Sequence, residues 1–252
     1  MKWRHILLLP LFGLLLGAAA PRLVPDVSQR QVDIIYSFTG AELLLFGAIL
    51  YPGGRLPDER ADIVVVLRGP SEPLTIRKKE RVLGIWINRH SARFETVPSY
   101  FAVASSAPIT RIVDEWTAAV YELGTNFLQL SPTSGNNAAE IREFENGLID
   151  LRSRAGLYRQ DAHGVEITQG VLYRARLKLP ARIPVGTYVA HTFLIQDGKV
   201  MAQATRDITI DKSGFERFVY VAAQHYSLLY GLTAVALAIA LGWIAGLVVK
   251  RK

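Results

Sequence analysis

The segment that most constrains this chain is Ser227–Val249, a stretch of 23 residues without a charge that Lys250, Arg251 and Lys252 follow directly. About 20 apolar residues in a helix cross the hydrocarbon core of a bilayer, whereas a buried helix of a globular domain usually carries a polar stripe. The sequence therefore predicts a transmembrane helix at residues 227–249. Because basic residues that flank a span stay in the cytoplasm, residues 250–252 are expected on that side.

The first 20 residues have the pattern of a secretory signal peptide. Lys2 and Arg4 precede an apolar run at 6–17, and Ala18 to Ala20 offer small residues for cleavage. An uncleaved anchor is the alternative that this pattern leaves open. In both cases the residues between the two apolar segments are expected outside the cytoplasm. The predicted parts are a signal peptide at 1–20, an exported domain at 21–212, a juxtamembrane helix or linker at 213–226, the span at 227–249 and a cytoplasmic tail at 250–252.

The net charge of +7 comes largely from these membrane signals. Five basic residues belong to the predicted signal peptide and tail, and the remainder holds 24 Lys and Arg against 22 Asp and Glu. A nucleic-acid-binding surface is therefore not indicated. The chain contains no cysteine, which excludes a disulfide framework, a thiolate metal site and a thiol nucleophile.

Apolar and alternating segments between Gly and Pro turns predict a β-rich exported domain. Residues 63–67 show no polar alternation and predict a central strand that is covered on both faces. In residues 173–179 basic and apolar side chains alternate, which is typical of a strand with one exposed face. Asp197-Gly198 between two strand-like runs predicts a hairpin turn. The early strands are predicted at 32–38, 42–50, 62–67 and 74–88.

Two amphipathic helices are predicted between the early and the late strands. Thr110 is the predicted N-cap of the first, and Asn137 with Glu140 forms a capping box at the start of the second. Their apolar stripes are expected to face the core and not a cofactor. The predicted stripes are Ile112, Val113, Trp116, Ala119, Val120 and Leu123 in the first helix, and Ile141, Phe144, Leu148 and Leu151 in the second.

A proline-rich corner leads into Gly186-Thr187-Tyr188. It resembles the E–F corner of immunoglobulin-like sandwiches, in which a Tyr hydroxyl is bonded to the backbone of the corner. We therefore predict a mainly β fold: an immunoglobulin-like β-sandwich with a two-helix insertion, plus a C-terminal transmembrane helix. Its strands are expected at 32–105 and 165–210, and its helical insertion at 108–156. Two small domains joined by helices are the alternative, although 165–210 alone supplies few strands for a core.

No sequence motif indicates catalysis, a metal site or a cofactor. The histidines form no His-x-His or His-x-x-x-His pair, and a Gly-x-Ser-x-Gly elbow, a phosphate loop and a dinucleotide fingerprint are absent. We therefore expect a protein that is not an enzyme and needs no cofactor. The alternative is a membrane-tethered periplasmic hydrolase whose site is assembled from distant loops. Its candidate residues are Asp33, Glu95, His163 and His191.

Two features suggest binding. Arg77, Lys78, Lys79 and Arg81 place four cations in five residues ahead of Trp86, and such a cluster can hold an anion, meet lipid headgroups or dock an acidic partner. The alternative is a solvated edge strand whose charges prevent sheet-to-sheet aggregation. In the predicted span, small residues recur every fourth position and allow another helix to approach closely. These small residues are Ala234, Ala238, Gly242 and Gly246.

Six stretches spread over nearly the whole chain carry a family resemblance: residues 23–28 (LVPDVS), 49–52 (ILYP), 77–88 (RKKERVLGIWIN), 97–106 (VPSYFAVASS), 216–218 (ERF) and 228–231 (LLYG). In them the chain resembles a transmembrane protein family of alphaproteobacteria that has no established activity. The resemblance implies a signal, an exported domain and a single C-terminal span in the bacterial inner membrane. It also implies a transporter partner, a permease of the sulfite-exporter type, and it defines no catalytic residue.

The leading hypothesis is a non-catalytic accessory protein of the inner membrane. Its periplasmic sandwich would bind a membrane partner through the cations and Trp86, and its span would pack on a multi-span protein or on a second copy of the chain. The lipid bilayer itself is the remaining expected partner.

Overall fold

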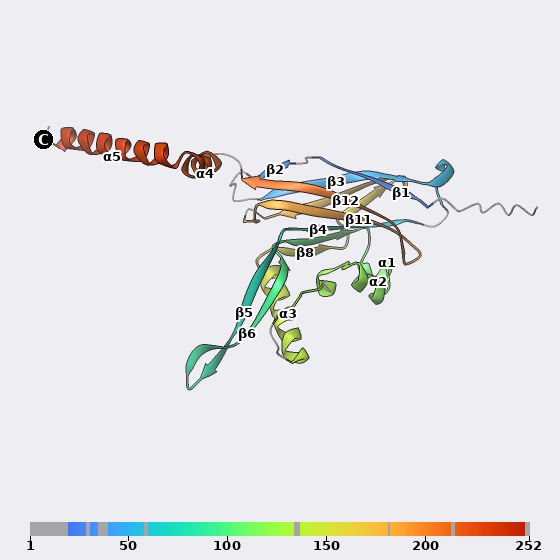
Figure 1. The fold of residues 1–252 in the computed structure, drawn as a ribbon. Helices are drawn as coiled ribbons and strands as arrows, with labels where there is room; N and C mark the ends of the chain where they lie inside the picture. Colours follow the sequence, from blue (N-terminus) through green and yellow to red (C-terminus); the bar gives the residue numbers. More distant parts are fainter. Residues whose placement is uncertain are drawn as a thin grey trace, which may run out of the picture.

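The computed structural model describes residues 20–28, 31–34, 40–57, 60–133, 137–180, 182–212 and 215–249. The predicted signal peptide, apart from Ala20, and the predicted tail lie outside these residues. The fold is mainly β, as predicted, with two stacked sheets from which a long hairpin and several helices project on one side (Figure 1).

The first sheet has four antiparallel strands and the second has six. In the second sheet the pairs β12–β2 and β7–β8 are parallel and the other pairs are antiparallel. A separate antiparallel pair forms the projecting hairpin. In spatial order the first sheet is β1 (Arg22–Val27), β3 (Ala41–Leu50), β10 (Leu172–Leu179) and β9 (Val165–Thr168); the second is β2 (Gln31–Ile34), β12 (Lys199–Lys212), β11 (Gly186–Gln196), β4 (Asp62–Arg68), β7 (Phe101–Ser105) and β8 (Tyr158–Asp161); the hairpin is β5 (Ser71–Val82) and β6 (Ile85–Pro98).

The main core lies between the two sheets and draws on strands from both halves of the chain. Leu45 of β3 and Leu177 of β10 pack in one buried cluster with Ile63 of β4 and Tyr188 of β11. Strand β4 is covered on both faces, as predicted, because Ile63, Val65 and Leu67 enter this cluster while Val64 and Val66 enter a second cluster under the helices.

Three local predictions are confirmed in the late strands. In residues 173–179 of β10 the apolar side chains are buried and Arg174, Arg176 and Lys178 are exposed. Asp197 and Gly198 join β11 to β12 with φ angles of 49° and 75°, the left-handed values that a tight hairpin turn requires. At the corner, the Tyr188 hydroxyl donates a hydrogen bond to the Pro184 carbonyl oxygen at 2.6 Å.

The prediction of one helix from Thr110 to Leu123 is wrong. Two short helices are present, α1 (Ile109–Ile112) and α2 (Glu115–Val120), because Val113 between them is extended and Asp114 caps the second by accepting from the Thr117 amide. The N-cap of α1 is Pro108 and not the predicted Thr110, which lies two residues further along the chain. Trp116 and Val120 are exposed and not in the core, since the break turns that face outward.

The third helix, α3 (Ala138–Arg154), begins as predicted. Asn137 is its N-cap, and its side chain accepts from the Glu140 amide at 2.8 Å. Phe144 and Leu148 are buried in the second cluster, but Leu151 is exposed at the end of the predicted stripe. The described residues also contain two 3-10 turns, η1 (Pro52–Gly54) and η2 (Thr125–Phe127).

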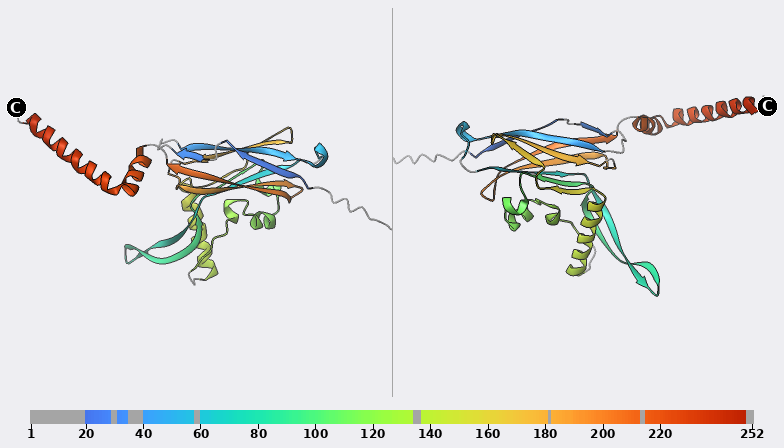
Figure 2. Two further views of the ribbon diagram at one scale, coloured as in Figure 1. Left: turned by 45° about the horizontal axis from the view of Figure 1, so that its top comes forward. Right: turned by 180° about the vertical axis from the view of Figure 1, so that it is seen from behind.

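Beyond β12 the chain forms α4 (Phe215–His225) and α5 (Ser227–Val249), which lead away from the sheets (Figures 1 and 2). The described side chains of α5 are exposed. Within the part of the chain that the structure describes, no helix reaches the combined length and hydropathy that a membrane crossing requires.

The prediction of a single strand at 74–88 is wrong, and the difference matters for function. The chain reverses at Leu83 and Gly84, so this segment belongs to two strands, β5 and β6, which pair with each other and not with either stacked sheet. Residues 82–87 (VLGIWI) form an apolar run through the reversal, and Leu is not a residue that marks a turn.

Candidate functional site

The candidate site is the projecting hairpin β5–β6. Leu83 and Gly84 form its turn, with φ angles of 50° and 88°, so both central residues are in the left-handed region. This is the conformation of the two-residue type I′ turn, for which Asn-Gly and Asp-Gly are preferred. The β11–β12 turn has Asp197 at the corresponding position, whereas this turn has a leucine.

The end of the hairpin exposes large apolar side chains. We call Leu83, Ile85, Trp86 and Ile87 the apolar tip; their exposed fractions are 98%, 68%, 66% and 43%. Adjacent apolar side chains exposed in this way mark sites of interaction with proteins or membranes, whereas single exposed ones are normal on any surface. The apolar tip is therefore a candidate binding feature of the β-rich domain.

The base of the hairpin is rigidly packed. Ala92, Phe94 and Val97 of β6 are fully buried in the second cluster, together with Phe144 and Leu148 of α3. An isolated bridge joins Phe94 to Pro132. The tip therefore projects from a fixed base, as both views of Figure 2 show.

One face of the hairpin is held against α3 by ion pairs and by a histidine–carboxylate contact. The Lys78 ammonium lies 2.6 Å from a Glu143 carboxylate oxygen, and His90 Nδ1 lies 3.0 Å from Glu140. The hydrogen bond that Lys78 donates to the Glu143 carboxylate raises the pKa of Lys78. Near the other end of α3, Arg152 pairs with Glu72 at 2.6 Å. These pairs brace the hairpin along the helix.

The opposite face of the hairpin is cationic. Arg77, Lys79 and Arg81 alternate with the α3-facing residues and are exposed. We call these three the outer cations. None of them forms an ion pair with a carboxylate in the described part of the chain. Trp86 lies directly opposite Arg81 in the strand register and so shares their face.

The residues predicted from sequence are thus divided between two roles. Arg77, Lys79, Arg81 and Trp86 lie together on one face, whereas Lys78 faces α3 and its charge is paired there. Sequence reasoning missed Leu83, Ile85 and Ile87. The signal that could have found them is the apolar run at 82–87, which contains Gly84 and lies between two charged segments.

The small residues predicted for helix packing lie on α5. Ala234 and Ala238 are exposed, and a Cβ added at Gly242 or Gly246 would meet no atom within 4 Å. The described part of the structure therefore leaves this face of the helix uncovered.

The candidate hydrolase residues lie on different elements. Glu95 is on β6, His163 is in the loop between β8 and β9, and His191 is on β11; the side chain of Asp33 lies outside the described set. Burial and the nearby Arg68 lower the pKa of His191, whose Nδ1 lies 3.2 Å from the Thr205 hydroxyl. Among the described residues, no group of three or more His, Asp or Glu side chains is placed to hold a metal ion.

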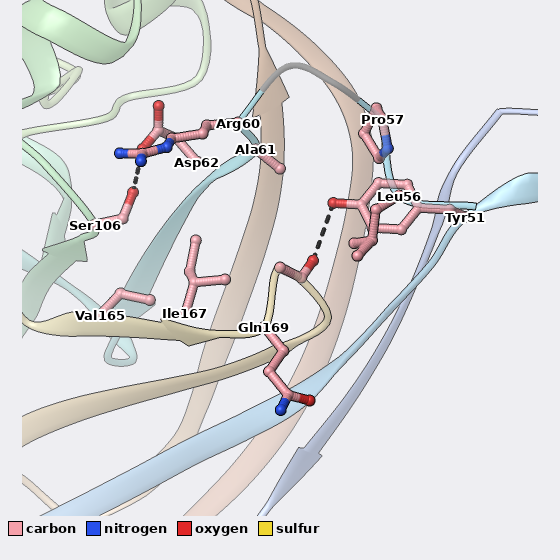
Figure 3. A pocket seen from close by; sticks show the side chains of 11 residues that line it. Tyr51, Leu56, Pro57, Arg60, Ala61, Asp62, Ser106, Val165, Ile167 and Gln169 are labelled. Carbon is pink, nitrogen blue, oxygen red and sulfur yellow. Dashed lines mark hydrogen bonds between the residues drawn. The ribbon is translucent and has the colours of Figure 1, made fainter. Parts of the chain in front are cut away.

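A cavity of about 470 Å³ opens at the end of the sandwich where η1 lies (Figure 3). Ser106 donates to Asp62 at 2.6 Å and accepts from the Ile63 amide, and the Tyr51 hydroxyl donates to the Gly170 carbonyl oxygen at 3.2 Å. These polar groups therefore bond to one another and close the end of the sheets. Among the residues whose side chains the structure describes, none that was predicted to bind or to catalyse lines this cavity.

Two solved structures are similar to this chain at 11% sequence identity. One is Spo0M, a sporulation control protein from Bacillus subtilis, with a TM-score of 0.31; the match covers 82% of this chain and 56% of that one. The chain thus spans little more than half the length of that protein. The other is BslA, a bacterial hydrophobin, with a TM-score of 0.21; the match covers 78% of this chain and 98% of that one.

No curated protein matches the chain. A family model described as "Putative transmembrane protein (Alph_Pro_TM)" matches residues 22–251, which include both sheets, the hairpin and the C-terminal helices. The match covers far more than half of the chain and agrees with the resemblance seen in the sequence. The chain belongs to this transmembrane protein family of alphaproteobacteria.

Proposed function

We propose that this protein is a non-catalytic accessory protein of the bacterial inner membrane. Its β-rich domain, which we assign to the immunoglobulin-like sandwiches, lies in the periplasm and presents the β5–β6 hairpin as a binding element, while α5 packs on a membrane partner. The observation that carries this proposal is the braced hairpin with its apolar tip and its outer cations. A fixed projection with exposed Trp, Ile and Leu is a binding element, since it contributes little to the core of its own domain.

The anchor in this proposal is α5. It has 23 residues and no charge, and the sequence continues apolar to Val249. The assignment to a span rests on the full sequence of the helix and on the family description.

The partner in this proposal is a multi-span membrane protein, such as the sulfite-exporter-type permease that the sequence resemblance implies. The uncovered small-residue face of α5 supports it, because Gly242 and Gly246 allow a second helix to approach closely. A second copy of the chain would use the same face.

Detergent extraction and affinity purification of the tagged full chain test the accessory role. We expect a multi-span protein to co-purify, and Gly242→Leu with Gly246→Leu to remove it. Ala236→Leu with Ala240→Leu is the matched control, since it adds bulk to another face of α5 and should leave the complex intact. The accessory role would be contradicted if the chain were recovered alone and neither pair of substitutions changed the size of the purified particle.

A further inference from the structure

The apolar tip is apolar on more than one side. Cross-strand partners share a face of a strand pair. Trp86 pairs with Arg81 on the outer face, Ile85 pairs with Val82 on the face toward α3, and Leu83 is at the turn. A flat protein surface would cover only one face of such a hairpin, whereas the lipid of a bilayer would surround both faces and the end.

The outer cations stand behind the tip in a row. Arg81, Lys79 and Arg77 follow one another at steps of two residues, or about 7 Å each along a strand. Elements that lie in a membrane interface bury their apolar part roughly 5–10 Å deep and keep cations at the level of the headgroups. Trp is enriched at that level because its ring is apolar and its N–H is polar.

The charge of this face favours an anionic surface. Glu80 is the nearest carboxylate in β5, but it points to the α3 side, where it lies 3.6 Å from Arg89 and 4.0 Å from Lys78. The outer cations therefore have no opposing charge on their own face among the described pairs. Each Lys or Arg near an anionic bilayer strengthens binding roughly fivefold.

The tip of the hairpin also lies at the end of the domain from which the chain continues to the anchor. The tip and the end of β12, from which the chain continues to α4 and α5, lie at the same end of the sheets in the views of Figures 1 and 2. The η1 turn lies at the opposite end. If α5 is the anchor, the hairpin is on the side of the domain that faces the bilayer.

We propose that the apolar tip inserts into the headgroup layer of the membrane beside the anchor, with the outer cations bound to anionic lipid headgroups. This inference rests on the proposed membrane anchoring. The hairpin is then a second attachment, which fixes the orientation of the domain against the membrane.

The test uses the full chain in lipid nanodiscs. Because the chain has no cysteine, Leu83→Cys gives a single site for an environment-sensitive fluorophore. Leu56→Cys is the matched control, since Leu56 is an exposed leucine, 55% accessible, near η1 at the other end. Discs are made of phosphatidylcholine alone or with phosphatidylglycerol, and doxyl groups on the acyl chains quench a label that enters the lipid.

We expect doxyl quenching at residue 83 in the phosphatidylglycerol discs, weaker quenching in phosphatidylcholine or high salt, and none at residue 56. Arg77→Gln, Lys79→Gln and Arg81→Gln together should lower insertion by roughly fivefold per cation. Equal doxyl quenching of the labels at residues 83 and 56 would overturn the inference. So would quenching at residue 83 that is the same in both lipid compositions and in the triple variant. The inference would also be overturned if the label at residue 83 were shielded from solvent only in native membranes and crosslinked there to an acidic protein. A chain that fails to co-elute with the discs would refute the anchor itself, so the two failures are distinguishable.

Discussion

The leucine at the hairpin turn is expected to lower local stability. Leu83 has a φ angle of 50°, and the left-handed conformation costs an ordinary L-residue about 1–2 kcal/mol, whereas Asn adopts it more easily. Its side chain is 98% exposed, so replacing it removes almost no packing. We therefore expect Leu83→Asn to stabilise the hairpin by about 0.5–1 kcal/mol, which is roughly a two- to fivefold change in an opening equilibrium.

Amide hydrogen exchange in nonionic detergent, read on peptides from β5 and β6, measures that equilibrium locally. Exchange near the turn should slow about two- to fivefold in Leu83→Asn. In Leu56→Asn, a matched exposed leucine without a positive φ angle, β5 and β6 should exchange at the unaltered rate. Faster exchange in Leu83→Asn would mean that the leucine packs on the hairpin, and the account of the tip as a free binding surface would fail.

Four further outcomes are expected. Tyr188→Phe keeps the buried ring but leaves the Pro184 carbonyl oxygen without its donor, so urea unfolding should show a loss of about 1–3 kcal/mol, against almost none for the exposed Tyr226→Phe. Burial raises the pKa of Tyr158 to about 12 and also raises the pKa of Tyr188, so the folded chain keeps protons that the unfolded chain loses from about pH 10. The free energy of unfolding should therefore fall above pH 10, and it should fall less steeply in Tyr188→Phe. A free energy of unfolding that does not change with pH in this range would contradict the expectation. Asn137→Ala removes the α3 cap and should cost about 1 kcal/mol in thermal unfolding, while Asn126→Ala serves as the exposed control. Leu237→Arg with Leu241→Arg adds about 5–7 kcal/mol to the cost of a crossing and should release the chain from alkali-washed membranes, unlike Leu56→Arg with Leu151→Arg.

Local signals in the sequence predicted much of the fold. The Asp197-Gly198 turn, the Asn137 cap and the Tyr188 corner each depend on a few neighbouring residues with one preferred geometry, and all three are present. The apolar run at 63–67 also predicted its own burial, since a strand that is apolar at every position needs cover on both faces.

Features decided by tertiary context were not predictable in this way. The break at Val113 interrupts a stripe whose periodicity fits one helix, while Ile109, Ile112 and Ala118 of the two short helices are all buried in the second cluster. The cations at 77–81 were recognised from the sequence. Which of them faces α3 depends on the reversal at Leu83, and the residue types at this turn do not predict a reversal. The candidate site was therefore located from the sequence, whereas its shape came from the structure.

The central claim, a periplasmic domain held by one C-terminal crossing, is tested most directly by the sidedness of the two ends of α5. Alkaline phosphatase, which is active in the periplasm, and a fluorescent protein that matures in the cytoplasm are fused in turn after Lys252 and in place of the chain beyond Lys212. The account predicts fluorescence without phosphatase activity after Lys252, and phosphatase activity without fluorescence after Lys212. Phosphatase activity at both positions, or a full chain that stays in solution without detergent, would contradict it.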